Sequence, residues 1–508
     1  MSAVLTTDAP DAVDAGPHGA GVRAVFALAR FEARRMLTSL PVALVFLGYV
    51  AWIVWRGRSA WDGYPALQDA DRATQTMPVF FGLAVLVSAN FAVLRSRRHG
   101  TESHFDVLVL PAWHRTAAHA LSVVPAVVLT AVCVAGQFTW EAVKPGAVGH
   151  GSPAELAVGP LAVLLLGTLG VLLARVVRSA LAAPLGVVVL LLFVFVLGTG
   201  PSGADGTSWL APVVPGISSN TLPSELLGRP AARHALYLTG AALFAAFLAV
   251  LVSGGRNLAV RAGTALTLAL AVTGGVLQAR GVEPSPELTA ARVRASVRPE
   301  QTCVERGGST YCAFDEWVPR ADTWAEVVEG VQSLAGGTAH DRKLVVRQRI
   351  DARYGLKGYA AIPALTDAGQ VTVGTAWGGN RVPEFSSAVA AVLVAGTEAA
   401  GSELCDGRMV TVMWLSLAWQ DDPMDALRRV RLDDSVEGSA IVLSPTDPLT
   451  MTEGQTDVVR RLLENPPAGV GERVKEHWDE LTEPGVTTAR AAELLGVRGP
   501  DKADSCEE

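Results

Sequence analysis

Seven apolar runs in the first 280 residues constrain the fold more than any other feature of the sequence. Each is close to the roughly 20 residues that an α-helix needs to cross the hydrocarbon core of a bilayer. The runs extend over residues 37–55, 77–94, 116–138, 155–177, 181–199, 233–253 and 261–277. The sequence therefore predicts a polytopic α-helical membrane domain with six or seven transmembrane helices, located in the plasma membrane.

The distribution of charge divides the chain near residue 280. Residues 1–280 hold 19 Lys and Arg against 13 Asp and Glu, whereas residues 281–508 hold 23 against 36. We expect a disordered cytoplasmic tail at 1–21, a transmembrane domain at 22–280 and a water-exposed α+β domain at 281–508. Because a nucleic acid would need clustered Lys and Arg, the acidic second half argues against nucleic acid as a partner.

The arginines beside the apolar runs predict the orientation of the chain. Twelve lie before the first run or in the second, fourth and sixth connections, whereas the connections on the other side hold six Lys and Arg. Since positive residues are retained in the cytoplasm, we expect a cytoplasmic N-terminus. With seven spans, the C-terminal domain is then extracytoplasmic.

Residues 22–36 have apolar side chains at helical spacing, with arginines off that stripe. Two interpretations remain open. The segment is either an amphipathic helix along the cytoplasmic interface or the solvated start of the first span with its positive flank.

The connection between the second and third runs is the most informative stretch of the sequence. It begins at Arg95 and has the sequence RSRRHGTESHFDVLVLPAWHRTA. Within it, an amphipathic pattern predicts a short helix that Pro111 ends, before Arg115 opens the next span. The residues of this pattern are Glu102, Phe105, Asp106, Val109 and Leu110.

Here the sequence resembles the ABC-2 type permease family of actinobacterial ABC transporters. The resemblance is carried by Gly100-Thr101-Glu102, Leu110-Pro111 and Arg115-Thr116, together with the sequence FEARR at 31–35. It covers residues 24 to about 253, roughly half of the chain. A seventh span and an outer domain are departures from the six spans of the family.

The resemblance implies that residues 102–111 form a coupling helix, which contacts a separate ATPase subunit and transmits its closure to the membrane helices. It also implies that two permease chains, identical or homologous, form the pathway in the lipid bilayer. The residues that would couple to the ATPase are Glu102, Phe105, Asp106, Leu110, Pro111 and Arg115.

No catalytic motif is present in the sequence. The phosphate-binding pattern G-x-x-x-x-G-K-[ST] does not occur, so an ATPase would have to be a separate chain. After residue 280 only His340 and His477 occur, which gives neither a His-Glu-x-x-His zinc motif nor a base beside Cys405. We therefore predict that the chain is not an enzyme and holds neither a metal nor a cofactor.

The domain after residue 280 has the pattern of a mixed α+β fold. Strands are predicted at 344–350, 370–375 and 439–443. Helices are predicted at 321–334, 383–400, 407–418, 455–463, 470–481 and 488–495.

Two cysteines enclose a short hairpin pattern in this domain. The sequence from Cys303 to Cys312 has Gly307-Gly308 at its centre, where a type I′ turn needs positive φ at both positions. Counting outward from that turn places Cys303 opposite Cys312 in a non-hydrogen-bonded pair, with Cα atoms about 4.5 Å apart. We predict a disulfide between them, which is consistent with an oxidising outer compartment. The sequence leaves the pairing of Cys405 and Cys506 open.

Two functional hypotheses follow. The first is the permease subunit of an ABC-type exporter, driven by a separate ATPase subunit. The alternative is a membrane-anchored extracytoplasmic binding or sensor protein without transport activity. The transported substrate cannot be inferred, because no charged residue lies deep within a span.

Overall fold

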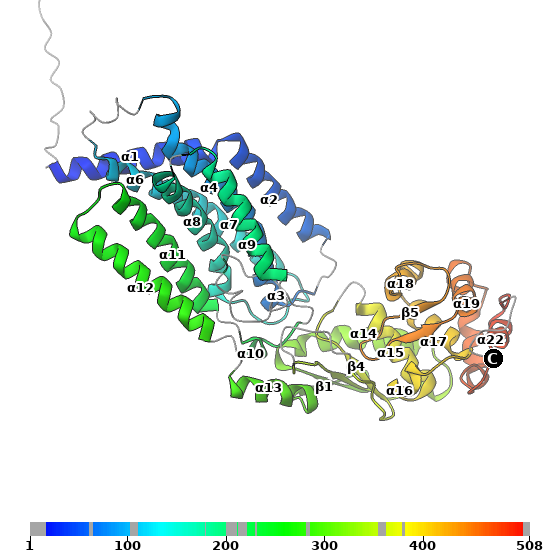
Figure 1. Ribbon diagram of the computed structural model, residues 1–508. Helices are drawn as coiled ribbons and strands as arrows, with labels where there is room; N and C mark the ends of the chain where they lie inside the picture. The colour runs from blue at the N-terminus through cyan, green and yellow to red at the C-terminus, as the bar shows by residue number, and fades with distance from the viewer. Residues whose placement is uncertain are drawn as a thin grey trace, which may run out of the picture.

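The computed structural model consists of a helical bundle followed by a C-terminal region with a small sheet (Figure 1). It describes residues 17–59, 64–101, 110–177, 179–199, 211, 221–228, 231–280, 285–353, 362–377 and 381–500. Within these ranges, the side chains of 17–20, 59 and 193–199 are not described.

Eleven helices are described in the first part of the chain. They are α1 (Pro17–Leu37), α2 (Leu40–Ser59), α3 (Leu67–Ala73), α4 (Thr76–Arg98), α6 (Ala112–Leu121), α7 (Val124–Ala142), α8 (Pro153–Val176), α9 (Ala182–Thr199), α10 (Ser224–Leu227), α11 (Ala231–Val252) and α12 (Leu258–Arg280). Helix α1 begins at Pro17, within the segment 1–21 that the sequence analysis assigned to a disordered tail.

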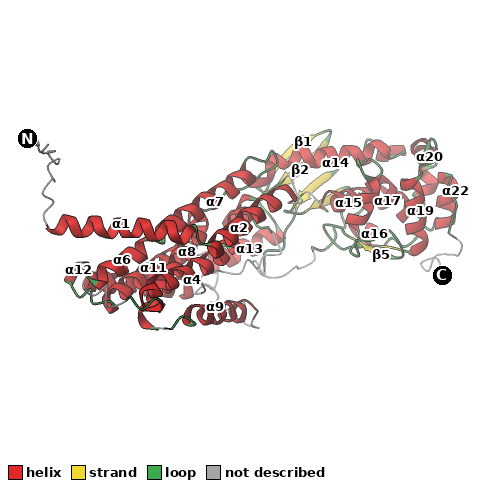
Figure 2. Cartoon of the chain, turned by 90° about the horizontal axis from the view of Figure 1, so that it is seen from above, coloured by secondary structure: helices red, strands yellow, loops and turns green. Residues whose placement is uncertain are grey.

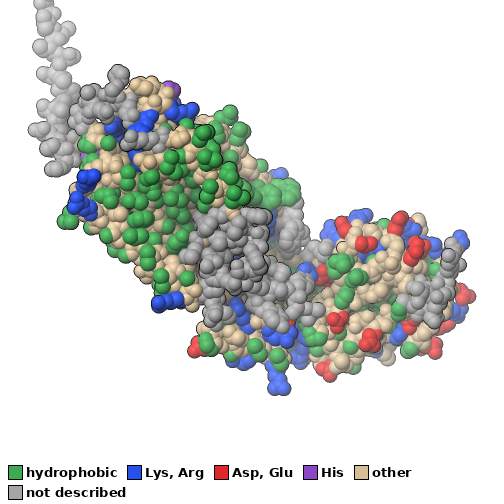
Figure 3. Space-filling model, in the orientation of Figure 1, with side chains coloured by type: hydrophobic (Ala, Val, Ile, Leu, Met, Phe, Trp, Pro, Cys, Tyr) green, Lys and Arg blue, Asp and Glu red, His purple; other side chains and the backbone are tan. Residues whose placement is uncertain are grey.

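Six segments of the described chain are long and apolar enough to cross a membrane. They are Leu40–Arg58, Leu67–Arg98, Ala112–Ala142, Pro153–Val176, Ala231–Val252 and Leu258–Arg280. The remaining predicted run corresponds to α9, whose described side chains are apolar from Ala182 to Leu192. Apolar side chains gather along the side of the bundle, whereas the C-terminal region carries many charged ones (Figure 3).

The bundle has two ends that differ in what lies against them. Helix α1 lies across one end, and the C-terminal region adjoins the other (Figures 1 and 2). We call these the α1 end and the junction end. Helix α8 finishes at the α1 end, where Ala174 packs with Met36 and Leu94, while α11 starts beside the junction end. Helix α9 therefore runs from the α1 end towards the junction end.

Glycines allow α4 and α8 to pack closely in the centre of the bundle. A Cβ on Gly170 would lie 2.3 Å from the backbone oxygen of Leu86, and one on Gly82 would lie 2.6 Å from Leu166. The buried amide of Asn90 donates to the Gly170 carbonyl at 3.2 Å. Small residues and polar contacts of this kind join membrane helices, so these residues have a packing role.

The third predicted run is two helices rather than one. Helix α6 ends at Leu121 and α7 begins at Val124, and Pro125 occupies the first turn of α7. Proline has no backbone N–H to continue the hydrogen-bond ladder, but it is tolerated in a first turn. Ser122 satisfies the end of α6 by donating its hydroxyl to the His119 carbonyl at 2.7 Å.

The C-terminal region is an α+β unit in which helices outnumber strands. Its elements are α13 (Pro286–Val297), β1 (Thr302–Arg306), β2 (Ser309–Ala313), η2 (Asp315–Arg320), α14 (Ala321–Leu334), η3 (Gly337–Ala339), β3 (Val345–Gln348), β4 (Gln370–Val373), α15 (Arg381–Ala395), α16 (Glu398–Ser402), α17 (Arg408–Leu417), α18 (Pro423–Val430), β5 (Ala440–Val442), β6 (Leu449–Met451), α19 (Glu453–Glu464), α20 (Val470–Glu476), α21 (Trp478–Leu481) and α22 (Thr488–Leu495).

The main sheet has four strands in the order β1-β2-β3-β4. Strands β1 and β2 are antiparallel, and β2, β3 and β4 are parallel. The edge strand β4 is covered by Glu398, whose carboxylate accepts from the Thr372 backbone N–H and, at 3.0 Å, from the Thr372 hydroxyl. It also accepts from the Leu365 N–H at 2.9 Å. Burial raises the pKa of Glu398, and these hydrogen bonds oppose that rise.

One hydrophobic core joins the C-terminal region to connections of the bundle. It contains Trp317, Trp324 and Trp377 together with apolar side chains of α15 and α17. The same core includes Val148 from the α7–α8 connection and Leu222 from the segment before α10. The C-terminal region is therefore attached to the bundle at more points than the chain connection after α12, because it also packs on two further connections of the bundle.

Candidate functional site

Three of the predicted coupling residues lie within the described residues. Leu110 is half-buried and packs against α1, close to Val25 and Ala29. Pro111 is exposed and directly precedes α6, and its carbonyl accepts from the Arg115 backbone N–H at 3.3 Å. Arg115 is half-buried. The other three, Glu102, Phe105 and Asp106, lie outside the described residues, together with the rest of 102–109.

Both ends of this connection are attached to α1. At the end of α4, the Arg95 guanidinium donates to both carboxylate oxygens of Glu32, at 2.9 and 3.0 Å. At the other end, Leu110 packs against Val25 and Ala29, and so does Ala118 within α6. Glu32 is only 6% exposed, so the carboxylate depends on Arg95 for compensation of its charge. A displacement of the connection would therefore move α1, α4 and α6 together.

The face of α1 that points away from α4 and α6 is exposed and carries both apolar and basic side chains. Val22, Phe26 and Phe31 are each more than half exposed, and Arg23 and Arg30 lie beside them. Phenylalanine rings flanked by arginines are typical of a helix in the membrane interface. The break at Thr38 and Ser39 separates α1 from α2, so α1 is a helix of its own rather than the start of the first span.

The connection between α11 and α12 lies beside the start of α6. The Thr116 hydroxyl donates to the Ser253 hydroxyl at 2.8 Å. A Cβ on Gly255 would lie 3.2 Å from the Trp113 Cβ. Helix α6 is therefore fixed to α11 as well as to α1, which makes the α1 end one connected unit.

At the junction end, a buried arginine connects the C-terminal region to the bundle. Arg320 is 2% exposed. Its guanidinium donates to the backbone carbonyls of Tyr64 and Gly146, which belong to two connections of the bundle, and at 3.1 Å to Thr375 after β4. Beside it, the rings of Tyr64 and Trp377 meet edge to face. One side chain thus connects three chain segments that are far apart in sequence.

Three further contacts stiffen the bundle side of this junction. Gln68 of α3 donates to the Leu222 carbonyl at 3.0 Å, and the Ser152 N–H donates to Asp71 at 2.8 Å. Gln75 donates to the buried carboxylate of Glu155 at the start of α8. These polar groups are buried but hydrogen-bonded, which is the condition for burying them at low cost.

The segment before α11 is also attached to α13. Arg292 donates to the carbonyls of Leu226 and Leu227 at 2.9 and 3.0 Å, at the end of α10. Gly228 follows with φ of 61°, and a Cβ there would lie 2.2 Å from Leu288. The transition from the bundle to the C-terminal region is therefore held at several points.

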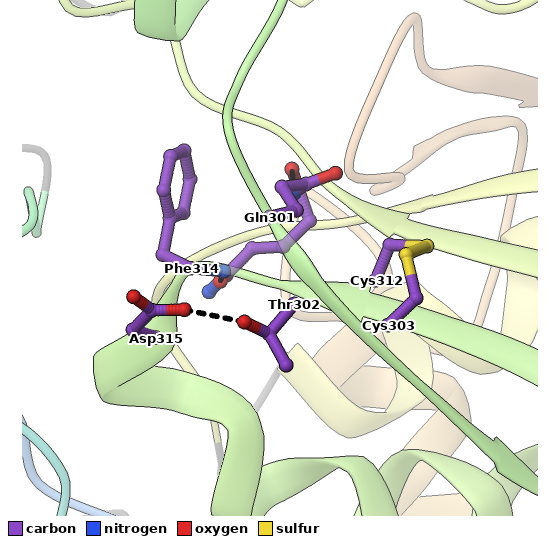
Figure 4. The surroundings of a disulfide bond; sticks show 7 residues. Gln301, Thr302, Cys303, Cys312, Phe314 and Asp315 are labelled. Carbon is purple, nitrogen blue, oxygen red and sulfur yellow. Dashed lines mark hydrogen bonds between the residues drawn. A yellow bond between two sulfur atoms is a disulfide. The ribbon is translucent and has the colours of Figure 1, made fainter.

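The predicted disulfide is confirmed (Figure 4). Cys303 and Cys312 are bonded to each other, and their Cα atoms lie 4.0 Å apart. The register is the predicted one, with Val304 opposite Tyr311, and both turn glycines have positive φ. Cys405 is also in a disulfide, Cys506 lies outside the described residues, and Cys133 is a free thiol.

The residues that connect the two parts of the chain were not predicted from the sequence. Arg320 has no motif around it, and its acceptors are backbone carbonyls, which carry no sequence signal. Glu32 lies in the FEARR sequence, but its partner Arg95 is 63 positions away. The one sequence signal for this pair is that Glu32 is a single carboxylate among Arg30, Arg34 and Arg35.

Within the described ranges, no group of three or more His, Cys, Asp or Glu side chains is arranged to hold a metal ion. With this geometry established, comparison with known proteins adds no relative: no family model, no curated protein and no solved structure matches the chain. The functional argument therefore depends on the residues and contacts of this chain.

Proposed function

We propose that this chain is the permease subunit of an ABC-type exporter and that a separate ATPase subunit drives it. The observation that carries the proposal is that the chain on both sides of the 99–111 connection contacts α1, through Arg95 at the end of α4 and through Leu110 and Ala118. A partner that pushes on this connection would act on three helices at once. Two copies of the chain, or one copy and a homologue, would form the pathway.

The distribution of charge supports a cytoplasmic location for the α1 end. Its basic residues are Arg23, Arg30, Arg34, Arg35, Arg95, Arg97, Arg98, Arg115, Arg175, Arg256 and Arg261. Positive residues of this number beside membrane helices are retained in the cytoplasm. The C-terminal region, at the junction end, is then extracytoplasmic, and the disulfide between Cys303 and Cys312 agrees with an oxidising compartment.

The test is recovery of an ATPase with the chain purified from its own cells after mild crosslinking. We expect an ATPase subunit in the wild-type sample. In Glu102→Lys we expect less of it or a loss of its substrate-dependent turnover, because the charge change disturbs a contact with the partner. In Leu110→Asp we expect the same loss, because a carboxylate replaces the apolar contact of Leu110 with α1. Leu258→Asp is the control, since Leu258 is 83% exposed at the same end of the bundle but outside the connection.

Unchanged ATPase recovery and unchanged turnover in both connection variants would contradict the coupling role. The purified chain alone should neither bind nor hydrolyse ATP, because the sequence lacks the phosphate-binding pattern. Saturable nucleotide binding by the chain alone would contradict that part of the proposal.

The alternative is a membrane-anchored binding or sensor protein, and one observation favours it. The core of the C-terminal region includes Val148 and Leu222, so a change in that region would reach the bundle directly. Neighbouring genes distinguish the two hypotheses: an adjacent ATPase gene favours export, and an adjacent kinase or regulator gene favours sensing.

A further inference from the structure

A cavity of about 380 Å³ lies in the C-terminal region beside the junction. Residues that follow β3 and β4, among them Ile350 and Trp377, form part of its wall. Ligands of open sheets with parallel strands bind outside the carboxyl ends of those strands. The volume is at the lower end of the range for small-molecule sites.

The walls of the cavity are mostly apolar. The apolar lining includes Phe385 of α15, Leu443 and Pro445. It also includes Leu432 and Ile441, whose side chains are exposed. Leu432 is 63% exposed and Ile441 is 45% exposed, although both are apolar. A pocket with an apolar lip and an apolar wall suits a ligand with an apolar body.

One positive charge at the cavity is poorly neutralised. Asp351 accepts from Arg353, and Glu384 accepts from Arg381 at 2.7 Å, so these two carboxylates already have partners. The nearest carboxylate to Arg349 is Glu398 at 3.9 Å, which is engaged with the backbone of β4. Arg349 donates from one nitrogen to the Pro363 carbonyl and the Thr372 hydroxyl. Among the described residues, its other N–H groups have no hydrogen-bond partner.

Trp377 contributes to the apolar wall of the cavity. It is 1% exposed, and its ring meets that of Phe385 edge to face. Its indole N–H is buried away from the cavity, so the polar recognition of a ligand depends on Arg349.

We propose that this cavity binds a small amphiphile with a carboxylate or phosphate head, which accepts hydrogen bonds from Arg349 while its apolar body lies against Phe385 and Leu443. The lining also includes Thr221 and Leu222, which are hydrogen-bonded to Asp69 and Gln68 of α3. A bound ligand would therefore contact a segment that is attached to the bundle. This inference does not depend on the ATPase and stands or falls separately from the export proposal.

The experiment uses the full chain in nanodiscs of zwitterionic lipid, with empty nanodiscs as the blank. Octanoate, octyl phosphate, octanol and inorganic phosphate are titrated by calorimetry. We expect saturable binding of octanoate or octyl phosphate or both, with at least about tenfold weaker binding of octanol and of inorganic phosphate. Whether carboxylate or phosphate binds more tightly identifies the head group.

One variant with a matched control tests the donor. Arg349→Met should weaken binding of the anionic amphiphiles about tenfold or more. Arg347→Met changes an exposed arginine two positions earlier that does not line the cavity, and it should bind within about twofold of the wild type.

A purely structural effect of Arg349→Met predicts a different result. It would weaken the binding of octanol as well, whereas the loss of a donor to the head group leaves octanol binding unchanged. The proposal is overturned if neither anionic amphiphile binds saturably, if octanol binds equally well, or if Arg347→Met loses binding as much as Arg349→Met.

Discussion

Glu32 and Arg95 are joined by a two-pronged ion pair, in which both carboxylate oxygens of Glu32 accept from the guanidinium at 2.9 and 3.0 Å. The pair fixes a helix that lies across the bundle to the end of a helix that runs through it. Bidentate pairs of this kind define an orientation as well as an attraction. Helix α1 is therefore held at a definite angle to α4.

Glu32→Gln should lower the free energy of unfolding by about 1–3 kcal/mol, because it leaves the Arg95 guanidinium beside a neutral group in a half-buried site. The measurement is thermal unfolding in nanodiscs. Arg34→Gln, on the exposed face of the same helix, should change stability by less than about 0.5 kcal/mol. In the double variant with Arg95→Gln, the loss should be smaller than the sum of the single losses, and additive losses would show that the pair contributes nothing.

Cys303→Ser with Cys312→Ser should destabilise the C-terminal region by roughly 2–3 kcal/mol without unfolding it, because the disulfide closes only a short hairpin. In the wild type, non-reduced peptide mass spectrometry should recover the linked pair. After mild reduction of intact cells, a membrane-impermeant thiol reagent should label Cys303, whose side chain is exposed, whereas Cys312 is 2% exposed. A reduced Cys303 that resists labelling would mean that the junction end faces the cytoplasm.

Arg320→Met should loosen the contact between the bundle and the C-terminal region. It leaves the carbonyls of Tyr64 and Gly146 without this buried donor, at roughly 1–3 kcal/mol for each group that stays dry, whereas Thr375 keeps the Trp317 indole N–H as a donor. Hydrogen–deuterium exchange should rise at the backbone amides of Leu67 and Val148, which pair across the two connections. Arg306→Met, which removes an exposed ion pair with Asp322, is the control and should leave that exchange unchanged.

Asp406 gives the C-terminal region a pH-dependent contribution to stability. Burial alone would raise the pKa of its carboxyl, but hydrogen bonds from Arg408 and the Gly485 N–H outweigh burial and lower the pKa. Because the folded pKa lies below the unfolded value, the contribution is present at neutral pH and is lost as the pH falls through the folded pKa.

Asp406→Asn should therefore cost about 1–2 kcal/mol at pH 7 and less near pH 3. Thermal unfolding of wild type and variant at the two pH values measures this difference. Asp421→Asn, at an exposed turn position, is the control. A cost that is equal at both pH values would show that the charge of Asp406 is not what stabilises the site.

The sequence correctly predicted the helices and strands whose formation depends on neighbouring residues. The hairpin from Cys303 to Cys312 was predicted residue by residue, because two glycines set the turn and the turn sets the register. Helices α14 and α22 have the predicted bounds. Helix α22 begins after Thr487, whose side chain accepts from the Arg490 N–H in the manner of an N-cap.

Predictions failed where a helix was interrupted or where distant segments met. The predicted helix 383–400 is α15 and α16, separated at Gly396 with φ of 90°, because a glycine there can take a conformation that ends a helix. The run 470–481 also divides, at His477, into α20 and α21. The contacts of Arg320 depend on the complete fold, since its acceptors lie up to 256 positions away.

The carboxylate of Glu398 has a consequence for how the protein behaves among other copies of itself. A terminal strand such as β4 offers N–H groups that can recruit a foreign strand and seed fibrils. Because Glu398 already accepts from Thr372, a recruited strand would have to expel a carboxylate from that position. Glu398 thus protects the free edge of β4 from pairing with a strand of another chain, and Glu398→Ala should increase aggregation of the protein.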